Sequence, residues 1–94
     1  MIESFACDET RNIFEGRQSR HLPPAIQKTA RRKLVYLDEA EDLRDLLAPP
    51  ANRLEKLRGV REGQYSIRIN DQWRMCFRWA DGRARDVEIV DYHY

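Results

Sequence analysis

Hydrophobic and polar residues alternate along two neighbouring stretches in the C-terminal half of the chain. Every second residue is aliphatic or aromatic from Tyr65 to Ile69, and again from Trp73 to Trp79. This two-residue period is typical of strands that bury one face. The pair Asn70-Asp71 between the two runs favours a turn, so we predict two antiparallel strands. The other face of the second strand carries Arg74, Cys76 and Arg78.

The N-terminal half shows helical spacing instead. Pro23-Pro24 favours the start of a helix, because proline is well tolerated in a first turn. Apolar residues then recur at intervals of three and four, at Ile26, Ala30, Leu34 and Leu37. These positions form one stripe, which we expect to be buried. The basic residues outside the stripe are expected to face solvent or a partner, and they are Lys28, Arg31, Arg32 and Lys33.

Shorter elements complete the predicted order. Residues 2–6 are interpreted as a first strand, and Asp8 as the N-cap of a brief helix through Phe14. An acidic segment over residues 38–45 leads into a last helical turn, which Pro49-Pro50 ends. The elements expected after it are a strand at 53–57, a turn around 61–63, a hairpin at Asp81-Gly82 and a final strand from residue 85 or 86.

The predicted fold class is α+β. Helices come first and strands second, an order that favours helices on one side of an antiparallel sheet. We predict an N-terminal short strand and two to three helices packed on one face of a mainly antiparallel sheet. The length is that of a single domain, residues 1–94.

Composition indicates a globular protein of the cytoplasm. The chain is 41% hydrophobic and 35% charged, which argues against disorder. No apolar run approaches the roughly 20 residues that span a bilayer, and no signal peptide is visible. Cys7 and Cys76 are too far apart to indicate a disulfide scaffold or a zinc site, so we interpret them as packed free thiols. A reducing cytoplasm fits best.

Charge is distributed unevenly along the chain. The net charge is only +1, which alone would argue against a nucleic-acid partner. Between residues 53 and 79, however, seven cations stand against three acids, and other acids cluster at residues 38–45. Binding depends on the local field, because salt screens charges beyond about 8–10 Å. The sequence therefore predicts a basic patch, formed by Arg53, Lys56, Arg58, Arg61, Arg68, Arg74 and Arg78.

No motif indicates a metal or a cofactor. The chain has no P-loop, no dinucleotide fingerprint and no metal-ligand cluster, and its two histidines are His21 and His93. Cleavage of RNA remains open without either group, because the 2′-hydroxyl of the ribose supplies the nucleophile. Such an enzyme needs a base, an acid and cations around the scissile phosphate.

Arg74 is the first candidate for that chemistry. A guanidinium group can hold two phosphate oxygens at once, but it does not act as an acid or a base, since its pKa lies above about 12. The alternative is an arginine that pairs with an acid on a neighbouring strand. Charge alone leaves both possibilities open.

The region around Arg74 resembles the HigB group of toxins, the host-inhibition or GraT-type toxins of the RelE/ParE superfamily. The matching pieces appear in the family's order and spacing, and the match covers nearly the whole chain. They include Met1 to Phe5, Leu54, Leu57-Arg58-Gly59, Arg61-Glu62-Gly63, the strand at 65–67, Asn70, Trp73-Arg74, Phe77 and Asp91-Tyr92-His93. The resemblance implies a RelE-like fold.

The resemblance also implies roles for individual residues. Arg74 matches the family's catalytic arginine, and Arg58 a basic position that contacts RNA. The C-terminal Asp91, Tyr92 and His93 match residues that transfer protons or stack on the substrate; the alternative is a plain strand end. The remaining RNA-binding candidates are Arg53, Lys56, Arg61, Arg68 and Arg78.

One position departs from the family pattern. Several HigB-like toxins have a histidine in the first sheet strand, where this chain has Glu55. A glutamate there could be the general base, but it would also repel anionic RNA unless Arg53 or Arg58 neutralises it. An exposed glutamate paired with a cation is the alternative.

For function, the resemblance implies the toxin of a type II toxin–antitoxin system. Such a toxin is a ribosome-dependent, metal-independent endoribonuclease that cleaves translated mRNA and arrests growth. The implied partners are a HigA-like helix-turn-helix antitoxin and the ribosome with bound mRNA; promoter DNA is reached only through the antitoxin. Two alternatives share the fold, a ParE-like poison of DNA gyrase and a toxin-shaped binding module without activity, which Glu55 and the low net charge would suit.

Overall fold

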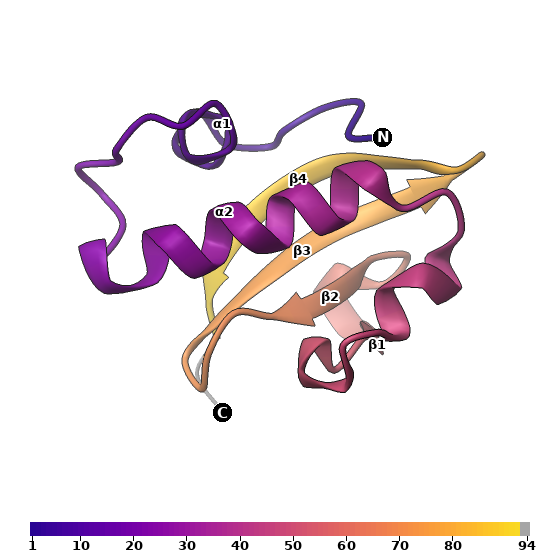
Figure 1. Ribbon diagram of the computed structural model, residues 1–94. Helices are drawn as coiled ribbons and strands as arrows, with labels where there is room; N and C mark the ends of the chain where they lie inside the picture. Colours follow the sequence, from indigo (N-terminus) through magenta and orange to yellow (C-terminus); the bar gives the residue numbers. More distant parts are fainter. Residues whose placement is uncertain (93–94) are drawn as a thin grey trace.

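Two helices lie over one face of a four-stranded sheet in the computed structural model, which describes residues 1–92 (Figure 1). The helices are α1 (Asp8–Phe14) and α2 (Pro24–Glu39). The strands are β1 (Glu55–Lys56), β2 (Tyr65–Arg68), β3 (Trp73–Ala80) and β4 (Arg83–Asp91). All three strand pairs are antiparallel, in the order β1-β2-β3-β4. The predicted α+β architecture is confirmed.

The core lies between α2 and the sheet. The predicted stripe of α2 is fully or nearly fully buried, as are Ile67 on β2 and Met75 and Phe77 on β3. β4 adds Val87 and Ile89 to the same cluster. The two-residue and the three-to-four-residue periods therefore identified the two faces that meet. Among the described residues, no helix has both the length and the hydropathy for a membrane crossing.

The N-terminal segment is not a regular strand, contrary to the expectation. It lies parallel to β4, with two isolated bridges that join Ile2 to Ala84 and Phe5 to Val87. The amide of Glu3 donates to the carbonyl of Ala84 at 2.7 Å, and that of Ala6 to the carbonyl of Val87 at 3.0 Å. These bonds cover the outer edge of β4, which would otherwise present unpaired backbone groups.

Three predicted boundaries were wrong by a few residues. Cys7, not Asp8, is the N-cap of α1, and Asp8 is the first helical residue. β1 is shorter than the predicted 53–57, because a 3₁₀ helix, η2 (Pro50–Asn52), leads into Arg53 with a left-handed backbone (φ 44°, ψ 59°). β4 begins at Arg83, directly after the hairpin.

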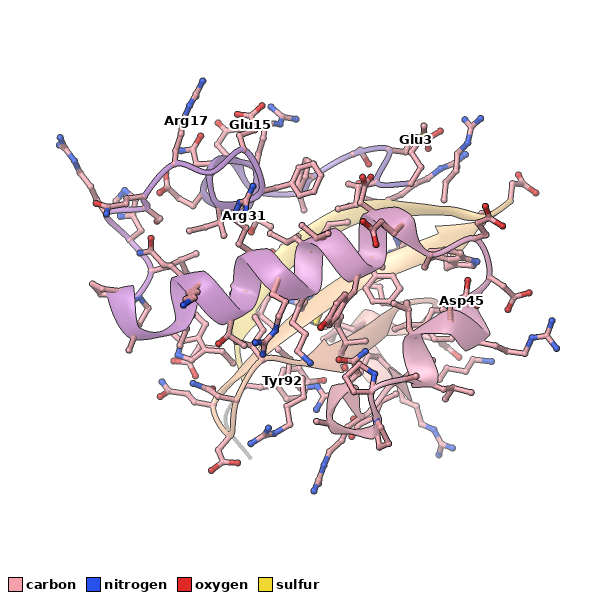
Figure 2. The ribbon with its side chains drawn as sticks, in the orientation of Figure 1. Glu3, Glu15, Arg17, Arg31, Asp45 and Tyr92 are labelled. Carbon is pink, nitrogen blue, oxygen red and sulfur yellow. The ribbon has the colours of Figure 1, made fainter. Side chains whose placement is uncertain are left out.

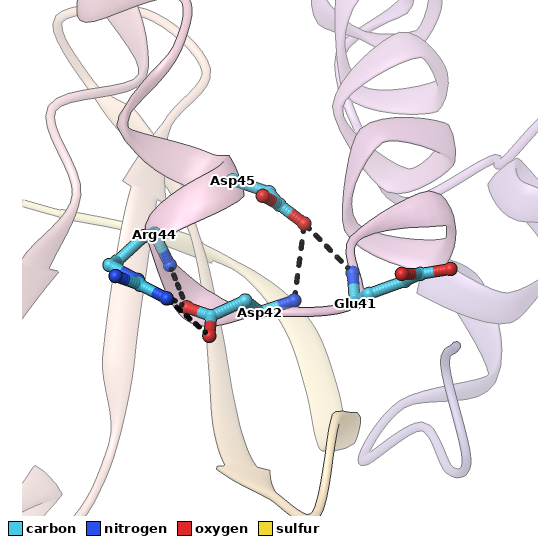
Figure 3. A network of polar contacts seen from close by, with 4 residues as sticks. All are labelled: Glu41, Asp42, Arg44 and Asp45. Atoms are coloured by element: carbon cyan, nitrogen blue, oxygen red, sulfur yellow. Dashed lines mark hydrogen bonds and ion pairs between the residues drawn. The ribbon is translucent and has the colours of Figure 1, made fainter.

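The acidic segment before η2 caps a 3₁₀ helix, η1 (Leu43–Leu47) (Figure 3). Asp42 accepts a hydrogen bond from the amide of Arg44 at 2.8 Å, and Asp45 accepts from the amide of Asp42 at 3.1 Å. This reciprocal arrangement is a capping box. The hydrogen bonds with Arg44 lower the pKa of Asp42 below its usual range. These acids therefore serve the local fold.

Lys33 corrects another expectation, since its side chain does not face solvent. It is only 4% exposed, and its ammonium group donates to Asn52 Oδ1 and stands 5.7 Å from the centre of the Tyr36 ring. Asn52, fully buried in η2, donates in turn to the carbonyl of Leu46 at 3.2 Å. The long side chain thus ties α2 to η2. Burial lowers the pKa of Lys33, and the charges of Arg32 and Arg68 act in the same direction.

Candidate functional site

Arg74 lies on the sheet face opposite the helices. Paired residues on this face form two neighbouring rows across the strands, and Arg74 is in the second. The pairing places Glu55, Ser66, Cys76 and Glu88 side by side, one from each strand. The next row holds Arg68, Arg74 and Val90. Because paired residues of adjacent strands point to the same side, both rows belong to one face. The sequence predicted this side for Arg74, Cys76 and Arg68.

The guanidinium group of Arg74 is buried, which differs from the solvent-facing arginine that we predicted. Arg74 is 5% exposed. Its Nε donates to Ser66 Oγ at 2.8 Å, and its Nη2 donates to the carbonyl of Arg53 at 2.6 Å. Nη1 is 3.9 Å from a carboxylate oxygen of Glu55. The segment that precedes β1 therefore covers the arginine and fixes its orientation.

The backbone of Arg53 makes this arrangement possible. A positive φ is uncommon for residues other than glycine and persists only where the surrounding structure holds it. Here the left-handed residue follows η2 and turns its carbonyl toward Arg74. The buried Asn52 holds the adjacent position through Lys33 and Leu46.

A hollow of about 250 Å³ opens beside the guanidinium group. It is lined by Arg53, Glu55, Arg68, Asn70, Asp71 and Arg74. Glu55 is about half exposed (47%) and is the carboxylate nearest to Arg74 Nη1. Arg68 pairs with Asp71 at 2.5 Å, and Asn70 accepts hydrogen bonds from the amides of Gln72 and Trp73. The hollow therefore joins a fixed cation to an accessible carboxylate.

A second polar group lies on the same face, next to Cys76. Arg61 donates to Glu88 at 2.9 Å and to Gln64 at 3.1 Å. The hydrogen bond with Glu88 raises the pKa of Arg61, and burial opposes this rise in part. Cys76 is fully buried, and burial raises the pKa of its thiol, so it packs as a neutral group.

The described part of the C-terminus is fixed to the turn before β3. Asp91 is in register with Trp73 and accepts a hydrogen bond from the Gln72 side chain at 3.1 Å. The amide of Tyr92 donates to the Gln72 carbonyl at 2.6 Å. Tyr92 contributes to the pKa shift of Arg61, whose side chain is on the Arg74 face. Asp91 is instead paired with Trp73, on the helix-side face. His93, also predicted for the site, lies outside the described residues.

Two acids of β4, which lie outside residues 53–79 in the sequence, pair with arginines of the predicted basic patch. Glu88 pairs with Arg61, and Asp86 lies 3.6 Å from Arg78. By contrast, Lys56 and Arg58 are exposed and have no ion-pair partner within residues 1–92. The free positive charge of the sheet is therefore concentrated at the β1 edge. Sequence reasoning missed Ser66 and Glu88, although their polar character on the Arg74 side of their strands was a usable signal.

Comparisons with known proteins agree on one family of toxins. Residues 3–93 match the model of a family described as the RelE-like toxin of the type II toxin–antitoxin system HigB. The chain is 39% identical to Toxin HigB-1 of Vibrio cholerae over 80 residues, which cover 85% of this chain and 84% of that protein. It is 29% identical to Endoribonuclease HigB of Proteus vulgaris over 93 residues, which cover 99% and 100% of the two chains.

A solved structure shares the fold. The structure titled YoeB-YefM complex from Staphylococcus aureus aligns with a TM-score of 0.61 at 20% identity, and the alignment covers 100% of this chain and 99% of that chain. At this identity the likeness concerns the arrangement of helices and strands.

Proposed function

This chain belongs to the HigB family, RelE-like toxins of type II toxin–antitoxin systems, and on that basis we propose that it is an endoribonuclease that cleaves translated mRNA on the ribosome. The relative from Proteus vulgaris carries the name Endoribonuclease HigB, which supports the reaction class. The observation that carries the proposal is the hollow in which Arg74 is held beside the open carboxylate of Glu55.

The reaction is the attack of a ribose 2′-oxygen on the adjacent phosphorus. The bond between that oxygen and phosphorus forms, and the bond from phosphorus to the 5′-oxygen of the next nucleotide breaks. A base removes the 2′-hydroxyl proton, and an acid protonates the leaving 5′-oxygen. Negative charge on the phosphoryl oxygens rises in the transition state, where fixed cations stabilise it most.

We assign the phosphate contact to Arg74 and the base to Glu55. Two nitrogens of the guanidinium group are held by Ser66 and Arg53, so Nη1 is the nitrogen that remains for a phosphoryl oxygen. A phosphate at this point would lie next to the Glu55 carboxylate, 3.9 Å from Nη1. Because the arginine is already oriented, little reorganisation is needed during the reaction.

The C-terminal residues belong to the leaving-group side in this proposal. Tyr92 would stack on a base, and His93 would protonate the 5′-oxygen, because histidine titrates near neutral pH. Asp91 has a positioning role, since its bond to Gln72 anchors the end of β4.

The cations around the hollow would hold the RNA backbone. Lys56 and Arg58 at the β1 edge are free to meet phosphates, and Arg53 and Arg68 line the hollow itself. Arg61 and Arg78 pair with acids of β4, and Arg68 pairs with Asp71, so the contribution of these three arginines to RNA binding would be smaller. A patch of this size gives modest affinity for RNA and little sequence specificity. We therefore propose that the mRNA is bound while it is held by the ribosome.

An antitoxin is the expected protein partner of a toxin of this type. We propose that it is a HigA-like helix-turn-helix protein, that promoter DNA is reached through it, and that the toxin acts in the cytoplasm. Arg61, Arg68 and Arg78 are paired with acids, which reduces the free charge for direct contact with duplex DNA.

Mapping of RNA 5′ ends tests the proposal. Induction of the toxin should create new 5′ ends within translated messages, detected by primer extension, and protein synthesis should halt before DNA synthesis. Arg74→Ala should abolish both effects, whereas Arg44→Ala, which removes an exposed arginine of η1, should leave them intact. DNA synthesis that halts first, without new ends, would point to a gyrase poison instead.

A further inference from the structure

Lys33 differs from a neighbouring cation of α2 in its surroundings. Arg31 is exposed and extends toward α1 (Figure 2), whereas Lys33 is only 4% exposed. A buried ammonium group is costly unless it is hydrogen-bonded, and Lys33 donates to Oδ1 of the fully buried Asn52. An apolar side chain would fill the same space without that cost. Packing alone therefore does not explain a lysine at this position.

Asn52 is held at both polar atoms of its side-chain amide. Its Oδ1 accepts the hydrogen bond from Lys33, and its Nδ2 donates to the carbonyls of Leu46 at 3.2 Å and Ala48 at 3.3 Å. Its backbone amide donates to the carbonyl of Pro49 at 2.9 Å. The side chain therefore joins α2 to the chain around η1 and η2, and it fixes the place at which η2 ends.

One peptide bond separates this anchored residue from a contact of Arg74. Arg53 follows Asn52 directly, and its carbonyl accepts the hydrogen bond of 2.6 Å from Arg74 Nη2. The left-handed backbone of Arg53 (φ 44°) directs that carbonyl toward the face of the sheet opposite the helices. Such a backbone persists only where the surrounding structure holds it. The hydrogen bonds of Asn52 to α2 and η1 supply that support.

We propose that Lys33 and Asn52 are positioning residues for the cleavage of RNA, because they fix the carbonyl that orients the guanidinium group of Arg74. The inference rests on the proposed function, in which Arg74 contacts the scissile phosphate. Lys33 and Asn52 are buried and do not line the hollow, so they act through Arg53. Without their support Nη2 would lose its anchor, and Nη1 would lose its fixed place beside Glu55. A misplacement of about 1 Å can slow a reaction by about 10²-fold.

A direct effect of charge is the alternative role for Lys33. Burial is the main cause that lowers the pKa of Lys33, and the charges of Arg32 and Arg68 contribute. The ammonium group therefore lies within electrostatic reach of Arg68, which lines the hollow. Positioning requires Asn52 as well as Lys33, whereas an effect of charge requires the lysine alone. Substitution of Asn52 separates the two roles.

Three variants test the proposal through single-turnover cleavage of translated mRNA. Lys33→Met keeps an unbranched side chain, Asn52→Leu removes the acceptor, and the double variant removes both polar groups. Each should slow cleavage by about tenfold or more, whereas co-sedimentation with ribosomes should be unchanged, because no exposed cation is lost. The effects of the single variants should not multiply in the double variant. The double variant also answers the question if Asn52→Leu, which leaves a buried ammonium group without its acceptor, does not fold.

Thr10→Val is the matched control for a loss of stability. Thr10 is fully buried, and its Oγ1 accepts a hydrogen bond of 3.0 Å from the amide of Ile89, which joins α1 to β4. This variant should unfold at a lower urea concentration than the wild type, yet cleave at the wild-type rate at a temperature where it is folded. Equally slow cleavage by Thr10→Val would overturn the proposal, as would wild-type cleavage by the folded double variant. Slow cleavage by Lys33→Met with normal cleavage by Asn52→Leu would overturn it in favour of an effect of charge.

A readout without RNA separates this proposal from the proposed function. The Nε–H group of Arg74 is buried and hydrogen-bonded to Ser66, so its proton should exchange slowly with water in NMR spectra, where Arg74→Lys assigns the signal by its loss. The double variant should exchange this proton about tenfold faster than the wild type, and faster than Thr10→Val does. Exchange no faster than that of Thr10→Val would overturn the proposal. Faster exchange in the double variant, together with no cleavage by the wild type, would support the orienting contact and count against the proposed reaction.

Discussion

Arg74 and Ser66 are joined by a hydrogen bond of 2.8 Å between Nε and the serine Oγ, across adjacent strands of the sheet. Ser66 is fully buried and Arg74 nearly so. A buried guanidinium group is costly unless its donors are satisfied. The bond therefore links the stability of the sheet to the orientation of the proposed catalytic arginine.

Ser66→Ala should impair both stability and cleavage. The substitution leaves a buried, charged donor without its acceptor, and a loss of this kind costs about 1–3 kcal/mol in the free energy of unfolding. Cleavage should fall as well, because the guanidinium group loses one of its two anchors. Urea denaturation and the rate of mRNA cleavage are the measurements.

Ser4→Ala provides the control for Ser66→Ala. Ser4 Oγ accepts a hydrogen bond from the exposed amide of Asp86 at 2.9 Å, far from the hollow, so this variant should cleave at the wild-type rate. A Ser66→Ala variant that unfolds more easily but cleaves normally at a temperature where it is folded would show that the bond has only a structural role.

Glu55→Gln separates the proposed base from an ordinary surface residue. The amide cannot take the 2′-hydroxyl proton, so cleavage should fall by about 10²- to 10⁴-fold. Binding to ribosomes should be retained or tighter, since a negative charge near the RNA is removed. Single-turnover cleavage and ribosome co-sedimentation measure the two effects.

Glu62→Gln is the matched control for Glu55→Gln. Glu62 is an exposed acid seven positions along the chain with no ion-pair partner within residues 1–92. Its substitution should change neither quantity. If both variants cleave at the wild-type rate, Glu55 is an exposed strand residue and another group is the base.

Local periodicity was sufficient to predict the faces of the fold. Met75 and Phe77 alternate with Arg74 and Cys76, and this alternation alone assigned them to opposite sides of β3. The stripe of α2 was predictable for the same reason, because burial on one side of a helix fixes the spacing of apolar residues. Both predictions depend on neighbours along the chain.

The burial of Arg74 could not be predicted in this way. Its partners are Ser66, 8 residues away, and the carbonyl of Arg53, 21 residues away. The second contact depends on a left-handed backbone at Arg53. A positive φ is uncommon for arginine, so the sequence does not predict it. Likewise, Arg61 and Glu88 are 27 residues apart, so the charge count over residues 53–79 omitted the acid that pairs with this arginine.

Lys33 should make the free energy of unfolding depend on pH. Its pKa in the folded chain is below the ordinary value of 10.5, chiefly because of burial. The unfolded chain therefore holds this proton more firmly, so the ammonium form opposes folding at lower pH. As the pH rises from the lowered pKa to 10.5, the wild type should gain stability relative to Lys33→Met, which does not titrate.

Urea titrations of both proteins over that pH range measure the effect. Lys28→Met is the control, because Lys28 is an exposed lysine of the same helix and its substitution should leave the pH dependence of the wild type unchanged. A difference between the wild type and Lys33→Met that is constant with pH would mean that the ammonium group is as well solvated in the folded chain as in the unfolded one.

Gln72 and Asp91 should act as one unit in positioning the C-terminal residues. The side-chain bond between them, 3.1 Å long, is exposed, so its loss should have little effect on the free energy of unfolding. Gln72→Ala and Asp91→Ala should each slow cleavage, because the end of β4 would lose a side-chain contact next to Tyr92 while its backbone hydrogen bond to Gln72 remains, and the double variant should be no slower than the slower single variant. A double-mutant cycle on the cleavage rate, with urea denaturation alongside, gives this result directly. Effects that multiply in the double variant would instead give Asp91 a role of its own in the reaction, such as the transfer of a proton.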